Sequence, residues 1–163
     1  MDDNHYFTID FGVNFAHKDR YDEQKLDKIM KESWEAGVDK VVCISNTIEE
    51  AEYNLQLAKK YENLYFTLGV HPHDAKHFKL KDLKFIEENL TNPKCFGIGE
   101  CGLDFNRNFS PQDKQIEAFE EQLKLAKKIP LVYIINQKSK RNGHVFEQTI
   151  FISHKKTVKF LFK

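Results

Sequence analysis

The chain has 163 residues, of which 40% are apolar and 31% are charged, and its 25 Lys and Arg residues are balanced by 25 Asp and Glu residues. This length and composition fit one ordinary globular domain. The balanced charge argues against histone-like or polybasic membrane binding, whereas local contacts with phosphate groups stay open. No apolar run approaches the roughly 18 residues of a membrane span, and the polar start MDDNHY is unlike a secretory signal.

The cysteines and the distribution of charge add two expectations. Cys43, Cys95 and Cys101 are too few for a disulfide framework, which favours a reducing, cytoplasmic location with the nucleus as the alternative. Residues 132–163 hold seven of the 25 basic residues and one of the 25 acidic residues, so this segment is basic while the preceding part is acidic. It shows no sustained helical or strand period. We therefore expect it to be the least regular segment, with at most one strand or short helix.

Before residue 132, short apolar runs alternate with amphipathic stretches, as in a series of strands and helices. Lys40–Ile44 is rich in β-branched residues, as expected of a buried strand. Thr47 and Glu50 form a capping-box pattern, and Ser110-Pro111 is typical of a helix start. The expected strands are Tyr6–Asp10, Lys40–Ile44, Leu64–Val70, Cys95–Gly99 and a fifth over Pro130–Ile135; the expected helices are Asp22–Ala36, Thr47 to about Tyr61, Leu80–Leu90 and Ser110 to about Lys128.

This alternation predicts an α/β fold built from βα units on a parallel sheet, in either a doubly wound or a barrel form. Both forms place ligands at the carboxyl ends of the strands. Unusual polar residues follow four of the predicted strands. They are Asp10, Gly12 and Asn14; Ser45 and Asn46; His71, His73 and Asp74; and Glu100, Asp104 and Arg107.

Several of these residues suit a site for phosphate or metal. Pro72 extends the backbone between His71 and His73, so both rings could reach one cavity, although a structural pair is equally open. Glu100 follows Gly97-Ile98-Gly99, and a carboxylate in such a place suits a divalent cation. The alternative is that Glu100 caps a turn or pairs with Arg107.

Asp104 and Arg107 could form a structural salt bridge, but an arginine beside carboxylates is also what a phosphate substrate needs. Cys101 could be a metal ligand or, more commonly, a small buried residue.

Two motifs carry a resemblance to a known family. Gly69–Asp74 (GVHPHD) and Gly97–Phe105 (GIGECGLDF) resemble the paired hallmarks of the TatD-type metal-dependent deoxyribonucleases. Ile9–Asn14 and Asn106–Ser110 fit the same pattern, and the resemblance covers residues 6–131.

The resemblance implies a TIM barrel related to the amidohydrolases, with divalent metal ions (Mg²⁺, Mn²⁺ or Zn²⁺) at its carboxyl end and DNA phosphodiesters as substrate. It assigns Glu100 as a catalytic metal ligand. His71, His73, Asp104 and Arg107 would contact the substrate, and Asp10 and Asn14 would lie on the rim.

The resemblance is incomplete. A full barrel needs about 250 residues, so this chain supplies about four to five of the eight βα units. The family has a histidine at the end of strand five, where Ile134 is nearest by spacing, and nothing around His144 or His154 matches a family motif. We expect residues 1–131 to be the first half of the barrel, and residues 132–163 to be a divergent basic tail from a frame change, an alternative splice or a truncated gene.

Three hypotheses about function follow. The chain could be a deoxyribonuclease whose missing metal ligands come from the tail or from a partner. It could be a non-catalytic half-barrel that binds other molecules or self-associates through exposed sheet edges. It could also be a doubly wound domain in which Glu100 is structural.

Overall fold

The computed structural model describes residues 7–17, 19–126, 132–141, 144–153 and 156–160, with side chains described up to residue 126. In chain order, the elements are β1 (Ile9–Val13), α1 (Glu23–Glu35), β2 (Lys40–Cys43), α2 (Ile48–Lys60), β3 (Leu64–Leu68), the 3-10 helix η1 (Ala75–His77), α3 (Leu80–Asn89), β4 (Cys95–Asp104), α4 (Gln112–Ala126), β5 (Val132–Arg141), β6 (His144–Ser153) and β7 (Lys156–Phe160).

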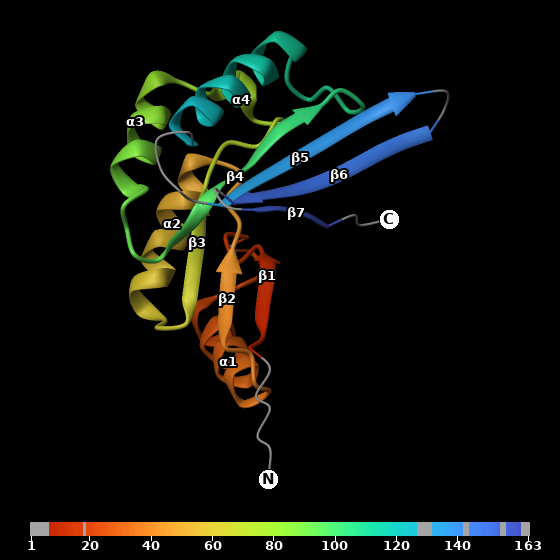
Figure 1. The fold of residues 1–163 in the computed structure, drawn as a ribbon. Helices are drawn as coiled ribbons and strands as arrows, with labels where there is room; N and C mark the ends of the chain where they lie inside the picture. Colours follow the sequence, from red (N-terminus) through yellow and green to blue (C-terminus); the bar gives the residue numbers. More distant parts are fainter. Residues whose placement is uncertain (1–6, 18, 127–131, 142–143, 154–155, 161–163) are drawn as a thin grey trace.

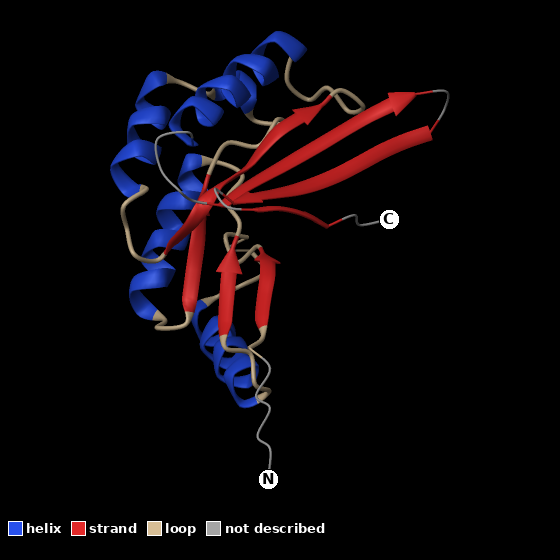
Figure 2. Cartoon of the chain, viewed as in Figure 1, coloured by secondary structure: helices blue, strands red, loops and turns tan. Residues whose placement is uncertain are grey.

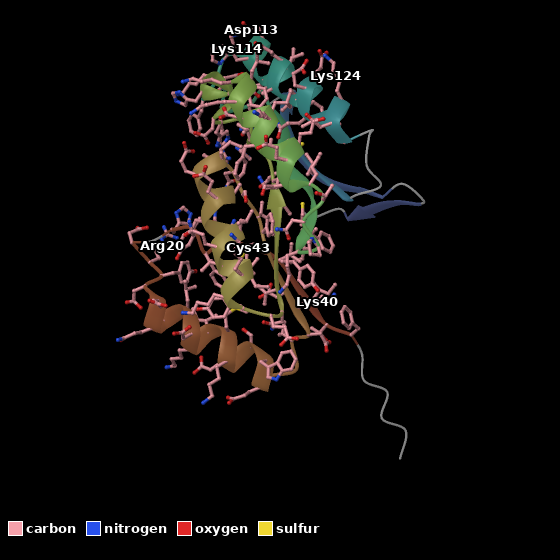
Figure 3. The ribbon with its side chains drawn as sticks, turned by 90° about the vertical axis from the view of Figure 1, so that its left-hand side faces the viewer. Arg20, Lys40, Cys43, Asp113, Lys114 and Lys124 are labelled. Carbon is pink, nitrogen blue, oxygen red and sulfur yellow. The ribbon has the colours of Figure 1, made fainter. Side chains whose placement is uncertain are left out.

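Strands β1 to β4 are parallel neighbours in sequential order, and β5 continues the parallel series beside β4. The helices that connect them lie on one face of this sheet (Figures 1 and 3). A doubly wound sheet reverses its strand order and carries helices on both faces. The sequential order therefore confirms the incomplete barrel and excludes the doubly wound alternative.

The sheet is curved, as a part of a barrel must be. Phe11 in β1 and Phe96 in β4 form an edge-to-face pair with ring centroids 5.2 Å apart. In a flat sheet these strands would be roughly 14 Å apart, because neighbouring strands are spaced by about 4.8 Å. The ring contact thus requires the sheet to curl.

The hydrophobic core fills the space between the sheet and the helices. The residues that pack there come from strands and helices alike, and burial of each large apolar side chain contributes roughly 1.5–3 kcal/mol. Its largest members, each at most 1% exposed, are Leu26, Val41, Leu64, Phe66, Leu68, Ile86 and Ile98. No described helix has both the length and the apolar character needed to cross a membrane.

Local signals set the ends of α1 and α2. Asp22 caps α1, accepting a hydrogen bond of 2.8 Å from the N–H of Lys25, and Gly37 follows the helix with a left-handed φ of 86°. Thr47 caps α2 through the N–H of Glu50 at 3.2 Å. The second half of the expected capping box differs, because the Glu50 carboxylate accepts from the backbone and side chain of Asn46 instead.

The prediction of an irregular tail is wrong. Strands β5, β6 and β7 extend the sheet beyond β4, and β6 is antiparallel to both of its neighbours (Figure 2). Arg141 pairs with His144, so two residues, Asn142 and Gly143, separate β5 from β6. Asn-Gly between runs of β-branched and aromatic residues is a strong hairpin signal, and it outweighs the missing period and the positive charge.

Two strand boundaries also differ from the prediction. β1 begins at Ile9, so Asp10 and Gly12 lie within the strand and not after it, and Tyr6 is outside the described residues. β4 continues to Asp104 because Cys101–Asp104 pair with β5. Glu100 and Asp104 are therefore strand residues, which fixes their backbone more firmly than a loop would.

Glycines let β3 and β4 approach closely beside the predicted site. A Cβ atom at Gly69 would lie 2.7 Å from the Cα and carbonyl carbon of Gly99. We expect Gly69→Ala to lower the free energy of unfolding by about 1–3 kcal/mol, because backbone atoms must move to make room. Urea denaturation measures this loss, and an unchanged midpoint would show that the approach is not required.

Candidate functional site

His71 and Glu100 meet where β3 ends and β4 bends. His71 Nε2 lies 4.0 Å from Glu100 Oε1, and His71 is only 8% exposed. The segment after β2 holds both residues, since the N–H of His71 donates to the carbonyl of Asn46 at 2.8 Å and the N–H of Glu100 donates to that of Ser45 at 2.9 Å. The predicted neighbourhood of His71 and Glu100 is confirmed.

The hydrogen bonds of His71 define what its ring can do. The backbone N–H of His73 donates to His71 Nδ1 at 3.2 Å, so Nδ1 carries a lone pair in this structure. A neutral imidazole with an accepting Nδ1 has its proton on Nε2. His71 therefore presents an N–H donor on the side of Glu100, whereas a histidine that binds metal through Nε2 would use Nδ1 as the donor.

Asp104 lies at the centre of a second cluster and is 1% exposed. Its Oδ2 is 2.7 Å from His73 Nε2 and 3.6 Å from a guanidinium nitrogen of Arg107, while Oδ1 accepts from the backbone N–H groups of Asn106 and Arg107. Burial acts to raise the pKa of Asp104, but the hydrogen bonds from Arg107, His73 and Asn106 outweigh it and lower the pKa. Asp104 is thus a carboxylate that orients a histidine and an arginine.

The two clusters are contiguous. The His71 and His73 rings form an edge-to-face pair with centroids 4.2 Å apart. The structure therefore brings together His71, His73, Glu100, Asp104 and Arg107. Arg107 lies 3.6 Å from Asp104, and Glu100 lies 4.0 Å from His71. The metal-ligand role of Glu100 and the phosphate contact of Arg107 stay predictions.

Asp10 and Asn14 are not tied to this group. Asp10 is an exposed residue of β1, and the side chain of Asn14 accepts a hydrogen bond from the N–H of Ala16 at 3.3 Å. Among the contacts described for these two residues, none joins Glu100 or His71. Their place on the rim of the site stays a prediction.

Two buried glutamines of α4, which the sequence did not suggest, hold the site's backbone. Gln115 accepts from the N–H of Asp104 at 2.7 Å and donates to the carbonyls of Asp104 and Ser110. Gln122 accepts from the N–H of Val70 at 2.8 Å and donates to its carbonyl at 3.2 Å. Both glutamines are fully buried, and their spacing of seven residues, on the face that also buries Ala118, is the signal that could have revealed them.

Ser110 differs from its predicted role as a helix cap. Its hydroxyl donates to the carbonyl of His73 at 2.6 Å and accepts from the N–H of Lys76 at 3.1 Å. It ties the loop before α4 to the segment that carries both histidines. The backbone around the site is thus fixed from α4, from β2 and from this loop.

The described side chains do not form a metal site by themselves. Within residues 7–17 and 19–126, no group of three His, Cys, Asp or Glu side chains is arranged to hold a metal ion. Cys101 is buried, which raises the pKa of its thiol to about 12, as expected of the small buried residue that is the alternative to a metal ligand. In the register of β4 and β5, Ile134 falls between the partners of Ile98 and Cys101, beside Glu100, and isoleucine offers no ligand atom.

Comparison with known proteins agrees with these motifs. Residues 9–157 match the model of the family described as TatD related DNase. The chain is 36% identical over 122 residues to the 3'-5' ssDNA/RNA exonuclease TatD of Escherichia coli K12, which covers 72% of this chain and 45% of that protein. The same protein of Shigella flexneri serotype 5b gives the same identity and coverage.

Solved structures give the same result. YJJV, a TatD homologue from Escherichia coli K12, matches with a TM-score of 0.66 and 28% identity over 78% of this chain and 49% of its own. A hydrolase TatD family protein from Entamoeba histolytica matches with a TM-score of 0.68 and 25% identity over 79% of this chain and 49% of its own. The chain therefore spans about half the length of the relatives that it matches.

Proposed function

Since the chain belongs to the family of TatD related DNases, we propose that its site binds the phosphodiester groups of DNA within a nuclease active site. The observation that supports this most strongly is the group of N–H donors beside Glu100. His71 Nε2, the His73 ring and the Arg107 guanidinium lie in one contiguous cluster, and Arg107 is 45% exposed at its side chain.

Each donor has a distinct part in binding. Arg107 can donate to two phosphate oxygens at once, because its guanidinium presents N–H groups in a fixed fork. His73 directs its Nε2 at Asp104 and so positions the carboxylate that pairs with Arg107, while Asp104 offsets part of the cluster's positive charge. His71 contributes the Nε2 proton on the side of Glu100. These groups bind and orient the phosphodiester without forming any covalent bond.

The divalent metal ion that the resemblance implies stays a proposal. Glu100 is the residue that we propose as its ligand and as catalytic. A hard cation takes about six ligand atoms, and the described side chains do not complete such a set. Unless the remaining residues or a partner supply further ligands, the chain on its own is expected to bind nucleic acid without cleaving it.

We accordingly expect no cleavage of single-stranded or duplex DNA above background with Mg²⁺, Mn²⁺ or Zn²⁺. A gel assay of the purified chain with labelled oligonucleotides measures this, and Glu100→Ala is the matched control. Cleavage that Glu100→Ala abolishes would show that residues beyond those described here complete the metal site.

Removal of Arg107 tests the binding itself. We expect Arg107→Ala to weaken binding of an abasic DNA hexamer about tenfold, because a hydrogen bond to a charged group contributes about 1.5–3 kcal/mol. Fluorescence anisotropy in EDTA measures the dissociation constant, and its slope against salt concentration should fall by about 0.7 for each phosphate that the protein no longer neutralises. The control is Lys40→Ala, which removes one charge at the amino end of β2 and should leave the dissociation constant and its salt dependence unchanged. Equal losses in both variants would refute a local phosphate site.

Two further proposals concern the state of the chain. We propose a cytoplasmic location, with the nucleus as the alternative, which is supported by the absence of a disulfide among the three cysteines. We also propose self-association through β1, one of the two edges of the described sheet. Ile9 in this strand is 39% exposed, and Phe7, two residues before it, is 61% exposed. Analytical ultracentrifugation tests this, and a monomer at all concentrations would exclude it.

A further inference from the structure

A large apolar side chain is displayed to solvent beside the candidate phosphate cluster. Phe109 is 60% exposed, and its ring contacts that of His73 edge to face, with centroids 4.6 Å apart. Single exposed apolar residues are common on protein surfaces and need no special explanation. Phe109 differs from an ordinary one because it adjoins His73 and lies two residues after Arg107.

The loop that carries Phe109 is fixed on both sides. Asn108 has a left-handed φ of 51°, its N–H donates to the carbonyl of Asp104, and its side chain donates to that of Phe105. The next residue, Ser110, is fully buried and bonded to His73. The Lys76 ammonium donates to the carbonyl of Phe109 itself at 3.1 Å. The backbone therefore holds this ring in place at the surface before any ligand binds.

Phe109 ends a continuous row of side chains that begins at Glu100. Glu100 lies 4.0 Å from His71, the rings of His71 and His73 are 4.2 Å apart, and those of His73 and Phe109 are 4.6 Å apart. The row begins at the largely buried side chains of Glu100 (18% exposed) and His71 (10% exposed) and ends at Phe109, which is 60% exposed. Its polar part suits a phosphate, and its open end offers an aromatic face.

We propose that Phe109 is a stacking platform for the nucleobase next to the phosphate that Arg107 binds. The proposal rests on the proposed function and assigns to Phe109 the contact with an unpaired base, in a single strand or at a frayed end. Bases within a duplex are stacked on their neighbours and do not offer a free face, whereas an unpaired base stacks readily on an exposed aromatic ring. Stacking of this kind tolerates any base, so little sequence preference is expected.

Two oligonucleotides separate stacking from phosphate binding. Fluorescence anisotropy in EDTA is measured with a labelled thymidine hexamer and with the abasic hexamer of equal length. We expect Phe109→Ala to weaken binding of the thymidine hexamer about tenfold, as for the loss of one stacked base, and to leave the abasic hexamer unaffected. The matched control is Leu80→Ala, at the start of α3, because Leu80 is an apolar residue that is 82% exposed. This substitution should change the binding of neither oligonucleotide.

A fluorescence measurement reports the stacking directly. In a Trp34→Phe background, Phe109→Trp places the single indole of the chain at the proposed platform. Its emission should be quenched by the thymidine hexamer and not by the abasic hexamer.

The outcomes separate the two proposals. Equal binding of both oligonucleotides by the unaltered chain, or no quenching by thymidine, would overturn the stacking proposal and leave phosphate binding intact. If neither oligonucleotide binds, both proposals fail for this chain.

Discussion

Gln115→Leu is expected to lower the free energy of unfolding by about 3 kcal/mol, the largest loss that we expect from a single substitution in this chain. Gln115 is fully buried and satisfies three backbone groups, namely the N–H and carbonyl of Asp104 and the carbonyl of Ser110. Leucine has a similar volume but no polar atom, so the N–H of Asp104 and the carbonyl of Ser110 would lose this partner, whereas the carbonyl of Asp104 would keep the N–H of Asn108. Each buried unsatisfied group costs about 1–3 kcal/mol.

Urea denaturation of the two chains measures this loss, and Gln112→Leu provides the control on the same helix. Gln112 is exposed and donates only one described hydrogen bond, to the Asn108 side chain. Its replacement should change the free energy of unfolding by no more than about 0.5 kcal/mol. Similar losses for both variants would mean that the effect does not arise from the buried hydrogen bonds of Gln115.

Asp104→Asn is expected to cost about 2 kcal/mol at pH 7, and this cost should shrink at acid pH. Asparagine retains an oxygen for the N–H groups of Asn106 and Arg107, but it loses the charge that attracts His73 and Arg107. The pKa of Asp104 is lowered in the folded chain, relative to an ordinary value of about 3.9.

The sign of the pH dependence follows from that shift. A lowered pKa means that the folded chain holds the proton less tightly than the unfolded chain, so the carboxylate stabilises the fold above about pH 3.9. This stabilisation is lost as the pH falls through the lowered pKa. Free energies of unfolding from pH 7 to pH 3 should therefore converge for the two chains, and a constant difference over this range would contradict the role of the charge.

The sequence was a good guide to the first four strands and their helices, because these depend on local signals. The apolar stripe of α1 and the caps at Asp22 and Thr47 act within a few residues of one another. Parallel order then followed from the alternation of elements. The parallel order also predicted correctly that His71 and Glu100 lie close together, because neighbouring parallel strands end side by side.

The other features of the fold and the site depend on contacts between residues far apart in the sequence, or on a local signal that conflicts with the composition of the tail. The seven-residue spacing of Gln115 and Gln122 indicates a shared face of α4, but not that each side chain binds the backbone of another element. β4 is longer than predicted because β5 pairs with its second half. The β5–β6 hairpin has a local signal in Asn142-Gly143, which outweighs the change of charge and composition on which the prediction of an irregular tail rested.

The ring nitrogens of the histidines test most directly whether this cluster binds nucleic-acid phosphate. With ¹⁵N-histidine-labelled chain, NMR should first show His71 Nδ1 without a proton, as its hydrogen bond from His73 requires. Addition of the abasic hexamer should then shift the signals of His71 and His73, while those of His17, an exposed residue in the loop after β1, stay in place. Saturable binding that leaves His71 and His73 unchanged would contradict the account, because the phosphate would then lie elsewhere on the chain.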